Sequence, residues 1–174
     1  MTNTQIREIS PEVLYSDGGF LAVDSRMISK LKAYAKASER KRCRLCFHAN
    51  ADAIQQEMLI VMHKSSYVRP HRHFGKSETL MVIEGAADAL LFNDQGTVET
   101  SLPMSPPDAG DMFFYKMPSG IFHTLSFRSE WFVFLETTIG PFDMSQSSHA
   151  EWAPPETDQP AGHTYMNSLK LPAA

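Results

Sequence analysis

Hydrophobic residues recur with a helical spacing in one early segment of the chain. Between residues 25 and 38, apolar side chains are separated by three or four positions, at Met27, Ile28, Leu31, Tyr34 and Ala35. This spacing gathers them on one face of an α-helix. We therefore predict a helix over 25–38, with Asp24 or Ser25 as its N-cap.

From about residue 43 the pattern changes to short apolar stretches separated by turn residues. These stretches are rich in β-branched and aromatic residues, which favour strands. We expect strands at 43–48, 57–63, 67–72, 78–84, 86–92, 97–102, 111–116, 121–127 and 131–138. The segment 93–96 is typical of a hairpin turn. Prolines cannot donate to a ladder, so those between 103 and 110 indicate a loop.

The strand pattern predicts an all-β fold in a single domain. Many short strands at even spacing are typical of a sandwich or a closed antiparallel barrel, and a length of 174 residues fits one domain. We expect three parts: an N-terminal extension with the helix (1–42), a β-barrel (43–142) and a Pro-containing C-terminal tail that packs on the barrel (143–174).

Charge and composition exclude several classes of partner. The formal net charge of −4 argues against a nucleic-acid-binding protein. No apolar run approaches the roughly 18 residues of a membrane span. The N-terminal segment MTNTQIREIS lacks the basic and apolar regions of a secretory signal. We therefore expect a cytoplasmic protein that binds neither nucleic acid nor membrane.

The two cysteines, Cys43 and Cys46, have the CxxC spacing of a redox pair or half of a zinc site. Both lie in a predicted strand, where residues three apart point to opposite faces. We therefore interpret them as two ordinary thiols.

The segment from Arg69 to Gly85 contains a metal-binding pattern. His71 and His73 are two residues apart on a predicted strand, so both imidazoles point to the same side and can reach one ion. Gly75 permits a tight turn. Glu78 then opens the next strand, which can return alongside the first and add a carboxylate oxygen.

A second segment, PSGIFHTLSF at 118–127, offers a fourth candidate ligand. After a turn at 118–120, the strand places His123 on one face together with Ile121, Leu125 and Phe127. A buried imidazole without a partner is costly, whereas one bound to a metal is satisfied.

The two segments resemble the two motifs of the cupin superfamily. His71, His73, Glu78 and Gly85 fit the first motif, and Pro118, Gly120 and His123 fit the second. The gap from Gly110 to Pro118 is two residues longer than in the usual second motif, and Phe127 stands where that motif commonly has Asn. The resemblance implies a double-stranded β-helix, an antiparallel jelly-roll barrel, that binds a metal through His71, His73, Glu78 and His123.

A closer resemblance is to the WbuC family of cupin-fold metalloproteins. It runs from the helix through RCRLCFH, QEMLIVMH and KSETLMVIEG to WAP near Trp152, and so covers most of the chain. Members are encoded among genes for surface-polysaccharide, O-antigen-type biosynthesis. The resemblance implies a protein that acts on, or assists an enzyme of, sugar or nucleotide-sugar chemistry, and cupin-like barrels often form homodimers through their flanking segments.

Three imidazoles and a carboxylate suit one divalent metal, which can be Zn, Fe, Ni or Mn. On an octahedral ion, four protein ligands leave two positions for water, O₂ or substrate oxygens. On a tetrahedral zinc, the same ligands could close the site and make it structural. The ligand set therefore leaves open whether the protein is an enzyme.

Several other polar residues are candidates for substrate binding. Arg42, Arg44 and His48 share one face of their strand with Cys46, where two guanidiniums could grip a carboxylate or phosphate if that face lines the barrel. If it points outward, they are solvated or lie at a dimer interface. Lys76 could touch a ligand at the barrel mouth, and Tyr115 could act as an acid or base.

Three functional hypotheses follow from the sequence. The first is a metal-dependent enzyme or accessory factor that acts on a sugar or nucleotide sugar in surface-polysaccharide biosynthesis, with a sugar or an anionic metabolite as its small-molecule ligand. The second is an iron-dependent dioxygenase-type oxidoreductase, which the ligand set allows. The third is a non-catalytic, metal-stabilised ligand-binding module.

Overall fold

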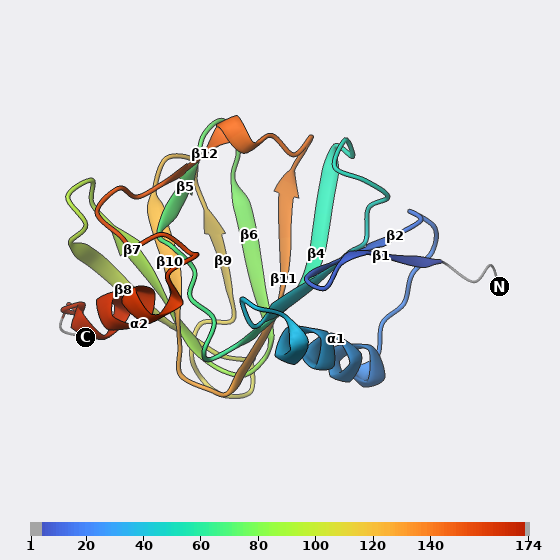
Figure 1. Ribbon diagram of the computed structural model, residues 1–174, viewed down its shortest axis with the longest axis horizontal. Coiled ribbons are helices and arrows are strands. Elements are labelled where there is room, and N and C mark those ends of the chain that lie inside the picture. Colours follow the sequence, from blue (N-terminus) through green and yellow to red (C-terminus); the bar gives the residue numbers. More distant parts are fainter. Residues whose placement is uncertain (1–4, 173–174) are drawn as a thin grey trace.

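The computed structural model describes residues 5–172, which form two facing β-sheets with a helix outside each (Figure 1). Residues 1–4 and 173–174, the ends of the predicted extension and tail, lie outside the described residues. The elements are β1 (Ile6–Ser10), β2 (Val13–Ser16), α1 (Ser25–Ala37), β3 (Arg42–Cys46), β4 (Gln55–His63), β5 (His71–His73), β6 (Glu78–Glu84), β7 (Ala87–Phe92), β8 (Val98–Met104), β9 (Phe114–Met117), β10 (Phe122–Phe127), β11 (Trp131–Ile139), η1 (Met144–Gln146), β12 (Ser147–His149) and α2 (Gln159–Ser168).

The strand order is that of a jelly roll. The larger sheet runs β1-β2-β3-β4-β11-β6-β9, and the smaller runs β12-β5-β10-β7-β8. Between β4 and β11 the chain passes back and forth between the two sheets, except at the β7–β8 hairpin of the smaller sheet, in the manner of paired Greek keys. Within the described residues each sheet ends in edge strands that do not bond to the other sheet. The predicted closed barrel is therefore corrected to a two-sheet sandwich.

The main core fills the space between the sheets. Alternate residues of β4, β6 and β11 meet those of β7 and β10, with Leu80, Phe132 and Phe134 opposite Ala89 and Leu125. A period of two along each strand produces this arrangement, because successive side chains point to opposite faces. The inner face so defined also carries the polar residues of the candidate site.

Helix α1 covers the outer face of the large sheet. It begins at Ser25, where the Asp24 carboxylate accepts hydrogen bonds from the backbone N–H groups of Arg26 and Met27. Leu31 and Ala35 pack against β3 and β4 in a second core. The predicted helix is thus confirmed, and of the two predicted caps, Asp24 and Ser25, it is Asp24 that caps it.

Strand β3 settles the orientation of the CxxC segment. Cys46 lies in the core between the sheets, whereas Cys43 lies in the core beneath α1. The two thiols therefore point to opposite faces, as the strand pattern predicts, and both are free. The face of β3 that carries Cys46 is the inner one.

The C-terminal tail covers the outer face of the small sheet. Its segment around Ala150 and Trp152, together with α2, packs on Leu90, Phe92 and Phe122 in a third core. Neither α2 nor β12 was predicted from the sequence, and nor were β1 and β2, because all four are short or lack a clear apolar period. No helix among residues 5–172 is long and apolar enough to span a membrane.

Several observed strands begin or end a few residues from the predicted boundaries, and two of these differences have a clear physical cause. The strand expected at 67–72 begins only at His71, because the carbonyl of Val68 accepts from the Thr124 hydroxyl and the N–H of Arg69 donates to Glu156. Pro103 lies inside strand β8 rather than in a loop. This proline is tolerated because β8 is the edge of its sheet, where no ladder bond needs its missing N–H.

Candidate metal centre

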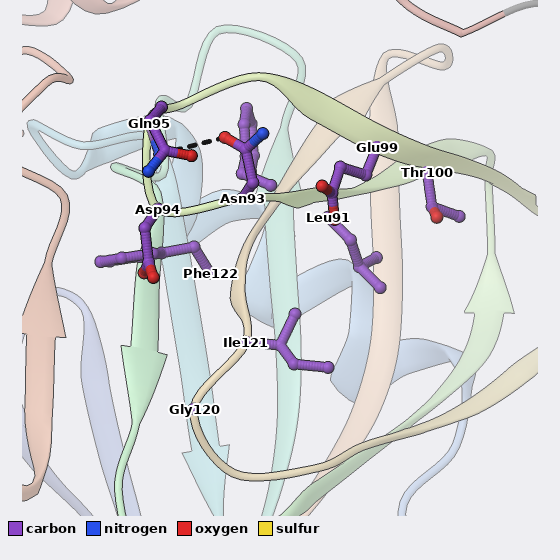
Figure 2. A pocket seen from close by; sticks show the side chains of 10 residues that line it. Leu91, Asn93, Asp94, Gln95, Glu99, Thr100, Gly120, Ile121 and Phe122 are labelled. Atoms are coloured by element: carbon purple, nitrogen blue, oxygen red, sulfur yellow. Dashed lines mark hydrogen bonds between the residues drawn. The ribbon is translucent and has the colours of Figure 1, made fainter.

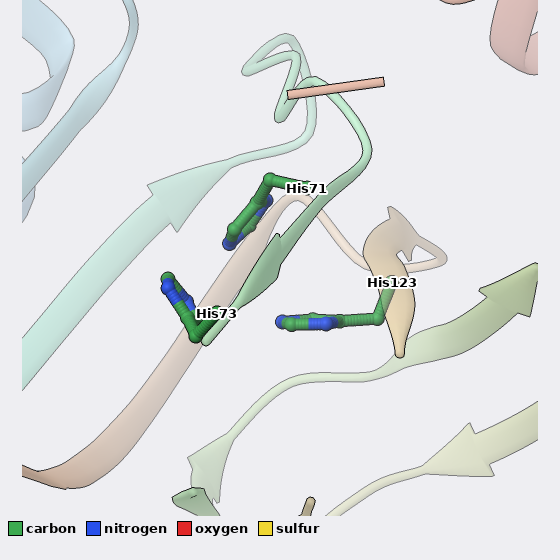
Figure 3. Close-up of side chains that lie close together, drawn as sticks. All are labelled: His71, His73 and His123. Atoms are coloured by element: carbon green, nitrogen blue, oxygen red, sulfur yellow. The ribbon is translucent and has the colours of Figure 1, made fainter. Parts of the chain in front are cut away.

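His71, His73 and His123 converge on the inner face of the small sheet (Figure 3). His71 lies directly opposite His123 in the antiparallel β5–β10 pair, and His73 lies two residues further along β5. One ring nitrogen from each imidazole falls within a group whose atoms are all within 4.8 Å of one another. These three residues could therefore hold a metal ion.

Glu78 reaches the same place from the other sheet. Its Oε1 lies 2.9 Å from His123 Nε2, and its Oε2 lies 3.3 Å from His73 Nε2. The sequence predicted that its strand would return beside β5. Instead, β6 belongs to the large sheet, so Glu78 arrives across the sandwich. The turn between β5 and β6 contains Gly75, whose φ of +72° suits glycine.

The hydrogen bonds of the Nδ1 atoms leave the Nε2 atoms directed at the centre. His71 Nδ1 lies 3.0 Å from the Arg69 carbonyl, and His123 Nδ1 lies 2.9 Å from the Ile121 carbonyl. A carbonyl only accepts, so each of these Nδ1 atoms carries a proton, and Nε2 is the nitrogen of each ring that is left to bind a metal. His73 Nδ1 lies 2.8 Å from the Ser147 hydroxyl. This pattern is the one that orients metal-binding histidines.

Burial shapes the charge of the cluster. Burial, together with the neighbouring His123, lowers the pKa of His71 to about 3. Burial alone would raise the pKa of Glu78, but hydrogen bonds from His123 and His73 hold it well below its usual range. The cluster therefore presents an ionised carboxylate and a neutral imidazole, both suitable as metal ligands.

Sequence reasoning missed Glu136. In the β11–β6–β9 ladders it pairs with Leu80, which pairs with Tyr115, so all three side chains face inward. Glu78 is two residues from Leu80 on the same face, diagonal to both Glu136 and Tyr115. Burial and the Glu78 charge raise the pKa of Glu136 to about 8, and burial raises that of Tyr115 well above 10. Glu136 could have been identified because its side chain lies on the same inward face as that of Glu78. This can be recognised only when the pairing of β11 with β6 is known.

The candidate residues of β3 and of the segment after it, Arg42, Arg44 and His48, differ in what they contact. Arg42 is held by Glu156 of the tail, with its Nη2 2.7 Å from Oε2. His48 is buried, stacks edge-on against Tyr15, and accepts a hydrogen bond from the N–H of Glu57. Arg44 forms no ion pair among residues 5–172, and its Nε is buried without a hydrogen-bond partner.

Lys76 is buried, with 9% of its surface exposed, although it follows a turn. Its Nζ lies 5.9 Å from the centre of the Phe142 ring and forms no ion pair with any described residue. Its positive charge lowers the pKa of Glu136, as does that of Arg44. Lys76 and Arg44 are thus two cations near the inner carboxylates.

A separate pocket of about 340 Å³ lies at the β7–β8 hairpin and the turn before β10 (Figure 2). It is lined by residues 91–95, Glu99, Thr100 and residues 120–122. At its rim the Asn93 side chain accepts a hydrogen bond from the N–H of Gln95. None of the predicted site residues lines this pocket.

Comparisons with known proteins give partial matches. A protein-family model described as a domain of unknown function (DUF6016) matches residues 23–104, less than half of the chain. No curated protein matches the sequence.

Several solved structures are similar to parts of this chain. An uncharacterised protein with a double-stranded β-helix domain from Klebsiella pneumoniae is 16% identical, with 66% of this chain and 88% of that chain covered at a TM-score of 0.49. CapF in complex with an inhibitor is 15% identical, with 61% and 31% covered at a TM-score of 0.48. A putative sugar phosphate isomerase from Acidithiobacillus ferrooxidans is 19% identical, with 51% of each chain covered at a TM-score of 0.41. This chain therefore spans less than two thirds of the last two proteins.

Proposed function

We propose that this chain is a metal-binding cupin whose centre is formed by His71, His73, Glu78 and His123. The observation that supports this proposal most is the convergence of three Nε2 atoms and one carboxylate, with each Nδ1 already hydrogen-bonded. Three nitrogen donors and one oxygen donor suit Zn, Fe, Ni or Mn. A bound ion would supply Lewis-acid chemistry to an oxygen of a ligand.

We further propose that the ligand is a small anionic molecule, a sugar or nucleotide sugar. Arg44 and Lys76 support this class because both are cations near the inner carboxylates without an ion pair among the described residues. A carboxylate or phosphate would satisfy them. Tyr115 and Glu136 lie on the same inner face as Glu78, where either could move a proton.

Two other predicted binding residues have a smaller place in this proposal. Arg42 is already paired with Glu156, and His48 Nδ1 already accepts a backbone hydrogen bond. We assign them to holding the inner face of β3 in place beside Arg44. The resemblance to the WbuC family supports a role, as enzyme or accessory factor, in surface-polysaccharide biosynthesis. The homodimer and the cytoplasmic location stay predictions.

Metal analysis tests the centre. We expect the purified protein to bind one divalent ion per chain, measured by elemental analysis and by titration of the chelator-stripped protein. His123→Ala should abolish this binding. His63→Ala is the matched control, because His63 lies on β4 and hydrogen-bonds Ser65 rather than the cluster. A wild-type protein that binds no divalent ion would overturn the proposal.

Ligand screening separates the three functional hypotheses. For the proposed function, thermal shift of the metal-loaded protein should detect binding of glucose 1-phosphate, glucuronate or UDP-glucose, but not of glucose. Oxygen uptake restored by iron would instead favour the dioxygenase, whereas zinc in the purified protein without such uptake would exclude it. A protein that unfolds on metal loss, yet binds none of these compounds and turns none over, would favour the non-catalytic module.

A further inference from the structure

The C-terminal strand β12 lies against the metal-binding strand β5. Its register pairs Ser147 with His73, Ser148 with Arg72 and His149 with His71. Directly paired residues in an antiparallel ladder share a face. Ser147 and His149 are therefore on the inner face with the metal-binding imidazoles, while Ser148 shares the outer face with Arg72. The rings of His71 and His149 have centres 6.1 Å apart.

Ser147 makes the side-chain contact that distinguishes His73 from the other two imidazoles. His71 and His123 are each oriented by a carbonyl of their own strand region, from Arg69 and Ile121. His73 instead has its Nδ1 2.8 Å from the Ser147 hydroxyl, which comes from 74 residues further along the chain. A hydroxyl can donate or accept, so it accommodates either tautomer, and it accepts when Nδ1 carries the proton.

The backbone around this contact is held independently of the Ser147 side chain. The carbonyl of Gln146 accepts from the N–H of Phe74 at 2.8 Å, and the N–H of Ala150 donates to the carbonyl of Pro70 at 2.8 Å. On the other side of His73, its own carbonyl accepts from the N–H of Gly120 at 2.8 Å. The strand positions are therefore fixed by main-chain bonds, and the Ser147 hydroxyl acts on the rotation of the His73 ring.

We infer that Ser147 is a positioning residue of the metal centre, supplied by the C-terminal tail, which holds His73 with Nε2 free to bind the ion. This inference rests on the proposed function, because it assumes that His73 is a ligand. Outer-shell partners of metal-binding histidines typically change metal affinity by about 10- to 100-fold when removed. The tail thus contributes to the centre as well as to the core.

The experiment compares Ser147→Ala with Ser148→Ala in the full-length protein. Affinities for Zn²⁺ and Co²⁺ are measured by competition with a chromophoric chelator, and the visible absorption of the Co²⁺ form reports the ligand geometry. We expect Ser147→Ala to weaken binding by about 10- to 100-fold and to shift the Co²⁺ bands. Ser147→Thr keeps the hydroxyl and should restore both. Ser148→Ala removes the same atom from the outer face and should match the wild type.

Urea unfolding of the metal-free variants separates positioning from folding. Ser147→Ala and Ser148→Ala should unfold at similar urea concentrations when stripped of metal. Ser147→Ala within twofold of wild-type affinity would overturn the inference, as would equal losses in the two alanine variants. Failure of the wild type itself to bind metal would instead overturn the proposed function, so the two failures are distinguishable.

Discussion

The carboxylate of Glu156 accepts hydrogen bonds from both terminal nitrogens of Arg42, at 3.2 and 2.7 Å, across 114 residues of sequence. Glu156 also accepts from the N–H of Arg69 and contacts Arg40. It therefore ties the tail to β3 and to the segment before β5. Both side chains of the Arg42–Glu156 pair are mostly buried, at 17% and 19% exposure.

We predict that Glu156→Gln lowers the free energy of unfolding by about 2 to 4 kcal/mol, because it leaves a largely buried arginine without its charged partner. Urea denaturation measures this change. Glu151→Gln removes a charge from an exposed position of the same tail and should change stability by less than about 0.5 kcal/mol. Equal effects of the two substitutions would contradict the assigned role of Glu156.

The same pair gives a pH dependence. Burial alone would raise the pKa of Glu156, but the Arg42 charge and hydrogen bonds hold it below its ordinary value of 4.5. A carboxyl with a lowered pKa in the folded state stabilises fully above its unfolded pKa and loses that contribution as pH falls through the folded pKa. The stability difference between wild type and Glu156→Gln should therefore be constant above about pH 6 and shrink below pH 4.5. A difference that grows on acidification would contradict the lowered pKa.

Two inner-face carboxylates should differ in their effect on metal affinity. Glu78→Gln changes a carboxylate whose Oε1 lies 2.9 Å from His123 Nε2. We expect this substitution to weaken metal binding by more than the roughly 100-fold upper range of outer-shell effects. Glu136→Gln changes a carboxylate two ladder positions away on the same face and should weaken metal binding by less than about 10-fold. Titration with Zn²⁺ measures both. The reverse order would show that Glu136, rather than Glu78, completes the centre.

The two cysteines should be unreactive in the folded protein. Burial raises the pKa of Cys43 to about 12 and also raises that of Cys46. Because only the thiolate is nucleophilic, alkylation by iodoacetamide at pH 8 should be slow for both until the protein is unfolded. Residues three apart on a strand are separated by about 10 Å, so no disulfide should join them in the native fold. Mass spectrometry of folded and urea-unfolded samples checks this, and rapid labelling of either folded thiol would contradict it.

Gly85 and Gly75 should respond differently to alanine. Both have positive φ, +82° and +72°, but a Cβ on Gly85 would lie 1.9 Å from the carbonyl oxygen of Trp131, whereas one on Gly75 would meet nothing within 4 Å. We expect Gly75→Ala to cost about 1 to 2 kcal/mol from backbone strain alone. Gly85→Ala should cost at least about 3 kcal/mol, because the β11 backbone must also shift. Urea unfolding of the metal-free proteins measures both, and similar costs would show that β11 yields freely.

The local patterns of the sequence were sufficient for most of the elements. Helix α1 was predicted from the helical spacing of apolar residues such as Leu31 and Ala35 and from the N-cap candidate Asp24. The alternation of side chains along a strand predicted that Cys43 and Cys46 lie on opposite faces of β3. These features depend on neighbours within a few residues, which the sequence displays directly. The predictions of a loop at Pro103 and of a strand before His71 were wrong. Pro103 is accepted in β8 because this strand is at the edge of its sheet, and residues 68 and 69 are instead hydrogen-bonded to Thr124 and Glu156. Both features depend on distant parts of the chain.

The sequence by itself determined the four candidate ligands, through the spacing of His71, His73 and Glu78 and the motif around His123. Only the tertiary structure decided that Glu78 arrives from the opposite sheet, that Arg44 faces inward, and that Glu136 and Ser147 adjoin the centre. The physical reason is that strand alternation fixes which residues share a face, but not which face is buried or which strands become neighbours. That choice is made when the two sheets and the tail pack together.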